Sequence, residues 1–251
     1  MRERISRAMY YLLRAFTKAV VFSLARWEVV NADLLPEEGG IVLVSNHKHL
    51  LDPPLIAASA KRRLHPMAKR ELFETPLIGW ILWAYGAFPV RRHSADIGAL
   101  RAARNHLRGG KVVLMFPEGT RSEPEDGMRP ALPGAAMVAL LAGVKVVPVA
   151  VTGTEGIKIP GVFFLWMRRR RLTFRVEFGE PFDLATSSAD SKQAEEATDF
   201  MMRRVATLLP EFYQGAYGAA TAGTLVFARQ QTTASDETSS DPAETPQSDA
   251  D

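Results

Sequence analysis

Short apolar runs alternate along this chain with stretches that have helical spacing. The runs are bounded by Gly, Pro or polar residues and predict buried strands in residues 40–46, 64–72, 87–92, 111–119, 145–153 and 171–182. The stretches between them predict helices in residues 52–63, 75–86, 95–110, 133–144 and about 190–209. Strands that alternate with helices favour an α/β fold, here a single domain with a largely parallel sheet flanked by helices.

The N-terminal segment is predicted to form a basic amphipathic helix. At helical spacing one stripe consists of Arg4, Arg7, Tyr11, Arg14 and Lys18, and a second, apolar stripe consists of Ile5, Met9, Leu12, Phe16 and Val20. Such a helix can lie in the headgroup plane of a membrane, and a surface helix packed on the domain is the alternative. The cations interrupt the apolar residues, so we expect neither a signal peptide nor a membrane-spanning helix here.

The chain has 251 residues, 47% of them apolar, which is enough to bury the core of one domain. The last residues differ in composition: positions 229–251 hold six acidic residues and one Arg, rich in Ser, Thr and Ala. Such a segment has little to bury and is predicted to be flexible. We therefore expect an amphipathic membrane-associating helix in residues 1–26, the folded domain in 27–214 and a flexible acidic tail in 215–251.

The charge is unevenly distributed. Of the net charge of +3, residues 229–251 contribute −5, which leaves +8 on residues 1–228. A basic domain indicates an anionic partner, such as a phosphorylated metabolite or an acidic membrane surface. Nucleic acid fits poorly, because the cations are scattered and no basic motif of a known nucleic-acid-binding fold is present.

The sequence lacks the residues and motifs that several common catalytic and binding mechanisms require. There is no cysteine, which excludes disulfides, thiol nucleophiles and cysteine-ligated metals and favours a reducing compartment. There is also no Gly-x-Ser-x-Gly elbow, P-loop or dinucleotide glycine motif, so a serine-hydrolase mechanism is disfavoured.

The segment Ser-Asn-His-Lys-His-Leu-Leu-Asp follows the first predicted strand and contains the first candidate site. The two prolines after Asp52 predict that Asp52 caps a helix beginning at Pro53, with His47 in the turn before it. A hydrogen bond between the carboxylate and one ring nitrogen would leave the other nitrogen to take a proton from a substrate hydroxyl. The alternatives are an isolated cap with a loop histidine, or a metal site formed by His47, His49 and Asp52.

Two further segments at predicted strand ends carry cations. In Phe-Pro-Glu-Gly-Thr-Arg-Ser, residues 116–122, Gly119 permits a turn, Thr120 offers donors and Arg121 has a guanidinium that suits phosphate. Glu118 suits a substrate hydroxyl or a contact with Arg121, and a surface turn with a salt bridge is the alternative. Arg91 and Arg92 end another predicted strand, where alternation sends their side chains to opposite faces.

Four segments together, namely Asn-His-Lys-His-Leu-Leu-Asp, Gly-Ala-Phe-Pro-Val-Arg-Arg, Phe-Pro-Glu-Gly-Thr-Arg-Ser and Val-Val-Pro-Val-Ala-Val-Thr-Gly, resemble the motif blocks of the glycerolipid acyltransferases. Their order and separations are most similar to the 1-acylglycerol-3-phosphate acyltransferase branch. The resemblance covers about residues 41–154. Two positions depart from the family: His49 stands where Ser is usual, and Arg91 stands where Asp is frequent.

The resemblance implies roles for individual residues. His47 would be the general base and Asp52 its orienting partner. Arg92, matching the arginine of the second block, would bind the acceptor's phosphate together with Glu118, Gly119, Thr120 and Arg121. Arg91 shares this assignment, because the departure leaves open which arginine faces the phosphate, and Lys69 is a weaker candidate.

The resemblance also implies the reaction: transfer of a fatty acyl group from acyl-CoA or an acyl-carrier-protein thioester to the free hydroxyl of 1-acylglycerol 3-phosphate, giving phosphatidate, with no cofactor and no metal. It implies membrane lipids as partners and a peripheral or monotopic position at the cytoplasmic face of the membrane. Two alternatives stay open: an acyltransferase for another lysolipid acceptor, and a non-enzymatic peripheral lipid-binding protein.

Overall fold

The computed structural model of the chain describes residues 2–91, 96–123, 125–155, 157, 172–184 and 190–218. The chain divides into two compact units, residues Met1–Tyr217 and Gly218–Asp251. All helices and strands described below belong to the first unit.

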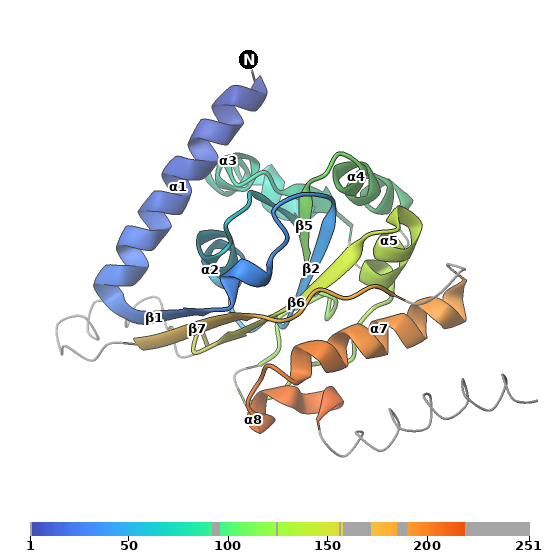
Figure 1. Cartoon of the computed structure of the whole chain (residues 1–251). Helices are drawn as coiled ribbons and strands as arrows, with labels where there is room; N and C mark the ends of the chain where they lie inside the picture. Colours follow the sequence, from blue (N-terminus) through green and yellow to red (C-terminus); the bar gives the residue numbers. More distant parts are fainter. Residues whose placement is uncertain are drawn as a thin grey trace, which may run out of the picture. The chain divides into compact units, whose positions relative to one another are not determined.

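In the described residues one sheet has the strand order β1-β7-β6-β2-β5-β3-β4 (Figure 1). The strands are β1 (Ala25–Val30), β2 (Ile41–Ser45), β3 (Leu64–Lys69), β4 (Phe88–Val90), β5 (Val112–Met115), β6 (Lys145–Thr152) and β7 (Leu172–Phe178). The strands from β6 to β4 are parallel to their neighbours, whereas β7 runs antiparallel to β6 and β1 runs parallel to β7. The prediction of an α/β domain with a largely parallel sheet is therefore confirmed.

Helices cover both faces of the sheet, as the arrangement in Figure 1 shows. The α-helices are α1 (Arg2–Leu24), α2 (Asp52–Ser59), α3 (Pro76–Ala84), α4 (Ile97–Arg108), α5 (Gly134–Ala142), α7 (Ser191–Ala206) and the short α8 (Glu211–Gln214). One apolar cluster packs α1 and α2 on the sheet, and a second packs α4, α5 and α7 on the opposite face. Because both faces of β2 and β5 are covered, these strands are buried throughout, which accounts for their continuous apolar sequence.

Short 3₁₀ turns join several of these elements, at Ala32–Leu34, Arg70–Glu74 and Gly215–Tyr217. The residues after the N-terminal helix differ from the expectation. The helix ends at Leu24, and residues 25–30 form strand β1 on the edge of the sheet, which the sequence analysis did not anticipate.

Helix α1 packs on the domain through a mixed set of side chains. Tyr10 is fully buried, its hydroxyl accepts a hydrogen bond from the backbone of Leu64, and the Arg14 guanidinium donates to the Ala60 carbonyl. The apolar stripe predicted from the sequence lies on the exposed side, where Leu12 is 61% and Phe16 66% exposed. No helix in the described part of the chain combines the length and the apolar character needed to cross a bilayer.

Candidate active site

The predicted site segments follow the carboxyl ends of parallel strands. His47 comes after β2 and Glu118 after β5, while Lys69 ends β3 and Arg91 follows β4. Carboxyl ends of parallel strands meet at one edge of a sheet, and such edges commonly hold the ligands of α/β proteins. The topology therefore brings the four segments to one edge, with β2 and β5 as direct neighbours.

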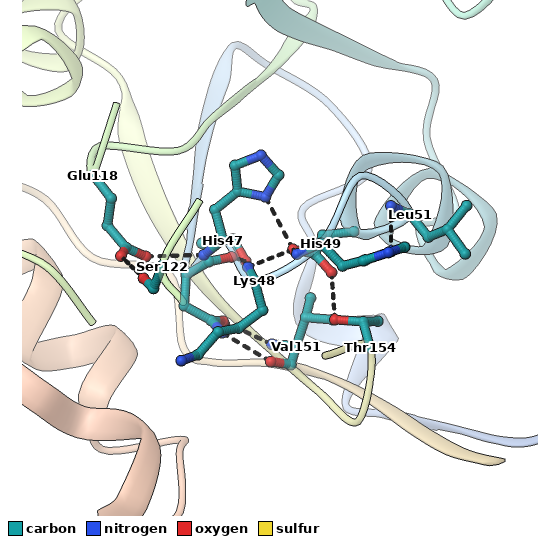
Figure 2. A network of polar contacts seen from close by, with 11 residues as sticks. His47, Lys48, His49, Leu51, Glu118, Ser122, Val151 and Thr154 are labelled. Carbon is teal, nitrogen blue, oxygen red and sulfur yellow. Dashed lines mark hydrogen bonds and ion pairs between the residues drawn. The ribbon is translucent and has the colours of Figure 1, made fainter. Parts of the chain in front are cut away.

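The side chains of His47 and Asp52 are hydrogen-bonded to each other at the start of α2 (Figure 2). His47 Nδ1 lies 2.9 Å from Asp52 Oδ2, and the two residues are 7% and 0% exposed. The His47 ring stacks on Phe116 with centroids 4.1 Å apart. Because a carboxylate only accepts, the His47 proton belongs on Nδ1, and Nε2 carries the lone pair that can take another proton.

The expected helix cap at Asp52 is wrong in its details. Helix α2 begins at Asp52 itself, its N-cap position is Leu51, and no side chain caps it. The Asp52 carboxylate turns back instead: Oδ2 accepts hydrogen bonds from the backbone N–H groups of Lys48 and His49, each at 2.7 Å. The carboxylate thus closes the turn that carries His47. This turn brings the two side chains, five positions apart in the sequence, into hydrogen-bond contact.

Glu118 holds the loop after β5 against the same turn. Its carboxylate accepts from the backbone N–H of His47 at 2.9 Å, from the backbone N–H of Arg129 at 2.9 Å and from the hydroxyl of Ser122 at 2.5 Å. Burial raises the pKa of Glu118, and these three donors oppose the rise. Both oxygens accept from protein donors, so Glu118 connects the loop after β5 to the backbone of His47, while its contact with the acceptor stays a prediction.

The rest of this loop lies beside the dyad. The backbone N–H of Ser122 donates to the His47 carbonyl at 2.9 Å. Gly119 has φ +70°, a backbone conformation that favours glycine. Thr120 is half-buried and Arg121 is exposed. The Arg121 charge contributes, after burial, to lowering the pKa of His49, which places this cation in the electrostatic environment of the site.

The remaining predicted cations are less closely tied to the dyad. Lys69 forms an exposed ion pair with Glu71 at 3.6 Å. The backbone N–H of Arg91 donates to Asp96, and the Arg91 side chain is exposed. Arg92, the prime phosphate candidate from the resemblance, lies outside the described residues.

The geometry does not favour the metal alternative. The described residues contain no group of three His, Cys, Asp or Glu side chains arranged to hold an ion. His49 Nδ1 accepts a hydrogen bond from the backbone of Leu51 at 3.2 Å, and both Asp52 oxygens already accept from protein donors. The three residues are therefore arranged as a hydrogen-bonded turn.

Three residues that were not predicted from the sequence support the site. Asn46, directly before His47, both donates to and accepts from the Val151 backbone at 2.8 Å, which ties the end of β2 to the end of β6. Thr154 donates to Asp52 Oδ1 at 2.7 Å. Lys48 Nζ is 5.7 Å from the centre of the Tyr213 ring and donates to the carbonyls of Glu123 and Asp126. Asn46 and Lys48 belong to the same motif segment as His47, and this position is the signal that could have indicated such a role.

A buried histidine–aspartate pair lies at the end of a parallel strand, beside a glycine-containing loop that carries an exposed arginine, and these groups suit the activation of a substrate hydroxyl. A family model described as acyltransferase matches residues 26–152, half of the chain, and the chain belongs to that family.

Similar proteins come from several bacteria. The chain is 29% identical to the 1-acyl-sn-glycerol-3-phosphate acyltransferase of Streptococcus pneumoniae over 80% of this chain and 72% of the relative. It is 29% identical to the protein of the same name from Bacillus subtilis, over 58% of this chain and 72% of the relative. Among solved structures it resembles the 1-acyl-sn-glycerophosphate (LPA) acyltransferase PlsC of Thermotoga maritima, with a TM-score of 0.63, 25% identity and 83% of each chain covered.

Proposed function

We propose that this acyltransferase transfers a fatty acyl group from an acyl thioester to the hydroxyl of 1-acylglycerol 3-phosphate, giving phosphatidate. The names of its relatives support the acceptor. The observation that carries the proposal is the buried hydrogen bond between His47 Nδ1 and Asp52 Oδ2, because it orients a neutral imidazole as a base. The acyl donor, acyl-CoA or acyl carrier protein, is a co-substrate, and no cofactor or metal takes part in the scheme.

His47 would act as general base and then as general acid. Nε2 takes the proton of the acceptor hydroxyl while the hydroxyl oxygen attacks the thioester carbonyl carbon. The tetrahedral intermediate then collapses, the carbon–sulfur bond breaks, and the imidazolium returns the proton to the leaving thiolate. Asp52 stabilises the transient imidazolium, which is the task of an orienting carboxylate in such dyads.

The acceptor's phosphate would bind beside the loop after β5. Arg121 is exposed, and the next residue, Ser122, bonds the His47 carbonyl through its backbone N–H, so the arginine belongs to the loop that contacts the turn of the dyad. Lys69 and Arg91 lie at the same sheet edge on the strands beyond β5 and would add positive charge, as would Arg92. Gly119 and Thr120 belong to the same loop and would line the phosphate site with Arg121. Several cations at one sheet edge suit a phosphate monoester better than an uncharged headgroup.

The lipid substrates would reach the site at a membrane surface. Besides the exposed stripe of α1, the neighbouring helix α3 exposes Leu77, Ile78, Trp80 and Trp83. Exposed tryptophans together with a basic amphipathic helix are typical of proteins that lie in the interface of a membrane. Peripheral or monotopic association fits this surface, and the water-soluble thioester donors favour the cytoplasmic face.

The first test is acyl transfer from oleoyl-CoA to lysophosphatidate by the intact protein, His47→Ala and His49→Ser. We expect His47→Ala to lose at least about 100-fold in kcat. His49→Ser is the matched control, because it changes a histidine of the same turn that does not bond Asp52 through its ring; it should stay within about fivefold of the intact protein. Thermal unfolding checks that each variant folds.

The results of these assays distinguish the proposed reaction from the alternative functions. Full activity in a folded His47→Ala protein would remove His47 as the base. An intact protein that is inactive on lysophosphatidate but active on another lysolipid would correct the acceptor. If the intact protein binds vesicles but transfers no acyl group from CoA or acyl carrier protein to any lysolipid, the proposal fails in favour of lipid binding without catalysis.

A further inference from the structure

Thr154, directly beyond the end of β6, completes the hydrogen bonding of Asp52 (Figure 2). Its hydroxyl donates to Asp52 Oδ1 at 2.7 Å, and both residues are fully buried. The other carboxylate oxygen, Oδ2, accepts from His47 Nδ1 and from the backbone of Lys48 and His49. Thr154 is therefore the side chain that fixes the carboxylate from the side opposite to the base.

The backbone around Thr154 is held in place. Gly153 has φ +86°, and a Cβ at this position would lie 1.9 Å from the Thr173 carbonyl oxygen, so the chain passes β7 where only glycine fits. On the other side, the Thr154 carbonyl accepts from the Ile157 N–H at 3.1 Å. The direction of the Thr154 hydroxyl is thus set by the backbone of the turn and not by side-chain packing alone.

A residue from the C-terminal helices secures the same turn. The Tyr213 hydroxyl, on α8, accepts from the Gly153 N–H at 3.4 Å and donates to the Glu155 carboxylate. Burial, followed by Glu155, raises the pKa of Tyr213 to about 12, so the phenol keeps the proton that this donation requires. The turn that carries Thr154 is therefore anchored to β7 and to α8 on either side of the hydroxyl.

We propose that Thr154 is a positioning residue for catalysis, which acts through Asp52 to hold the His47 ring in the productive orientation. The inference rests on the proposed role of His47 as base. A carboxylate held at one oxygen only could rotate about its Cβ–Cγ bond, and the Nδ1 hydrogen bond would then no longer set the direction of Nε2. The Thr154 hydroxyl also withdraws charge from the carboxylate, and its removal should strengthen the attraction between Asp52 and an imidazolium.

Other titratable groups lie near the dyad. Glu118, in the loop after β5, interacts with His47, and His49 in the same turn is influenced by His47, Asp52, Arg121 and Glu155. Because Thr154 bonds Asp52 and none of these groups, a shift in the pH profile of a Thr154 variant reports on the dyad.

The experiment compares Thr154→Val, Thr154→Ser and Thr152→Val by acyl transfer over a range of pH. Valine has the shape of threonine without the hydroxyl, serine keeps the hydroxyl, and Thr152 lies two residues earlier on β6 as a matched control. We expect Thr154→Val to lower kcat at least about tenfold, with KM for the acceptor within about twofold. We also expect the acidic limb of its kcat/KM profile to move to higher pH.

Rescue is the second part of the expectation. Thr154→Ser should recover kcat to within about threefold and restore the pH profile, and Thr152→Val should leave both unchanged. The inference is overturned if folded Thr154→Val keeps the kcat and the pH profile of the intact protein while His47→Ala remains inactive. A lower melting temperature with unchanged kcat and profile would also overturn it, because Thr154 would then stabilise the fold alone. An active His47→Ala protein would instead reject the proposed function on which the inference rests.

Discussion

At the scale of single residues, the buried carboxylate of Glu118 connects two segments that are far apart in the sequence. It accepts from the backbone of His47 on one side and from Ser122 and Arg129 on the other. A buried acceptor that loses its partners costs about 1–3 kcal/mol, and two of the partners here, His47 and Ser122, belong to segments with a proposed role in the site. Replacing Glu118 should therefore lower activity as well as stability.

Replacing Glu118 with Gln tests this expectation. The amide keeps one acceptor oxygen and presents N–H groups where the second oxygen accepted, so at least one donor loses its partner. We expect kcat to fall at least about tenfold and the free energy of unfolding to fall by about 1–3 kcal/mol. Steady-state acyl transfer and urea unfolding measure the two effects.

Glu125→Gln is the matched control, since Glu125 is an exposed carboxylate in the same loop. It should alter neither quantity by much, because exposed substitutions usually change stability by less than about 0.5 kcal/mol. If Glu118→Gln behaves as Glu125→Gln does, the Glu118 carboxylate does not set the position of His47.

At the scale of elements, β3 and α4 meet through two stacked imidazoles. The rings of His65 and His106 lie 4.6 Å apart and 17° from parallel. Burial, followed by the neighbouring His106, lowers the pKa of His65 from 6.5 to about 4, while a hydrogen bond to the Gly86 carbonyl opposes the shift. The stack is therefore a contact between neutral rings that acid should disrupt.

We predict that His65 makes the fold sensitive to mild acid. Between about pH 6.5 and pH 4 the unfolded chain binds a proton at this residue and the folded chain does not, so the stability that is present above pH 6.5 is lost as the pH falls. The loss should be on the order of 2 kcal/mol. Urea unfolding at pH 7.5 and pH 4.5 should show a smaller difference for His65→Gln than for the intact protein.

Comparing the variant with the intact protein isolates this contribution from other titrating groups. Glu118, whose pKa is raised, acts in the opposite direction in both proteins, because the folded chain binds its proton first as the pH falls. An identical pH dependence of stability in the two proteins would show that the stack does not oppose protonation.

Sequence patterns predicted those helices and strands for which a single local signal, an apolar run or a pair of cap residues, was clear. The runs in β2, β5 and β6 are apolar because both faces are covered, and α4 (Ile97–Arg108) lies between its cap residues Asp96 and Gly109. Strand β1 was missed because Arg26 and Glu28 interrupt its apolar residues and because it follows α1 without a break, and edge pairing with β7 has no local signal. Local propensity therefore located the interior of the sheet better than its edge.

The candidate site was only partly predictable for a related reason. The His47–Asp52 pair is local, and the spacing with two prolines was sufficient to suggest it. The partners that fix the pair are not local: Glu118 is 71 positions from His47, and Thr154 is 102 positions from Asp52. Which distant donors meet a buried carboxylate depends on strand order, which no single segment contains.

At the scale of the whole folded unit, α1 has two different faces. Toward the domain it is anchored by specific polar contacts: Arg14 bonds the Ala60 carbonyl, and Thr17 bonds the Tyr85 hydroxyl. Away from the domain, Leu12 and Phe16 find no apolar cover in the described structure. A helix that is fixed to the domain on one side and exposes an apolar stripe on the other is suited to bury that stripe in a membrane surface.

The last prediction is that this stripe supplies much of the membrane affinity. Fully burying one such side chain contributes roughly 1.5–3 kcal/mol, so Leu12→Gln with Phe16→Gln should weaken binding to vesicles of phosphatidylglycerol and phosphatidylcholine at least about tenfold. Co-sedimentation measures the affinity, and Leu141→Gln on α5, which is also an exposed apolar residue, is the control.

Turnover on a water-soluble, short-chain lysophosphatidate should remain within about twofold in the double variant, because neither residue is part of the candidate site. Unchanged vesicle binding would mean that α3 or the basic charge alone holds the protein to the bilayer. Loss of turnover on the soluble substrate would mean that α1 supports the catalytic domain itself. Only weakened vesicle binding with retained turnover fits a helix that packs on the domain through one side and binds lipid through its exposed apolar stripe.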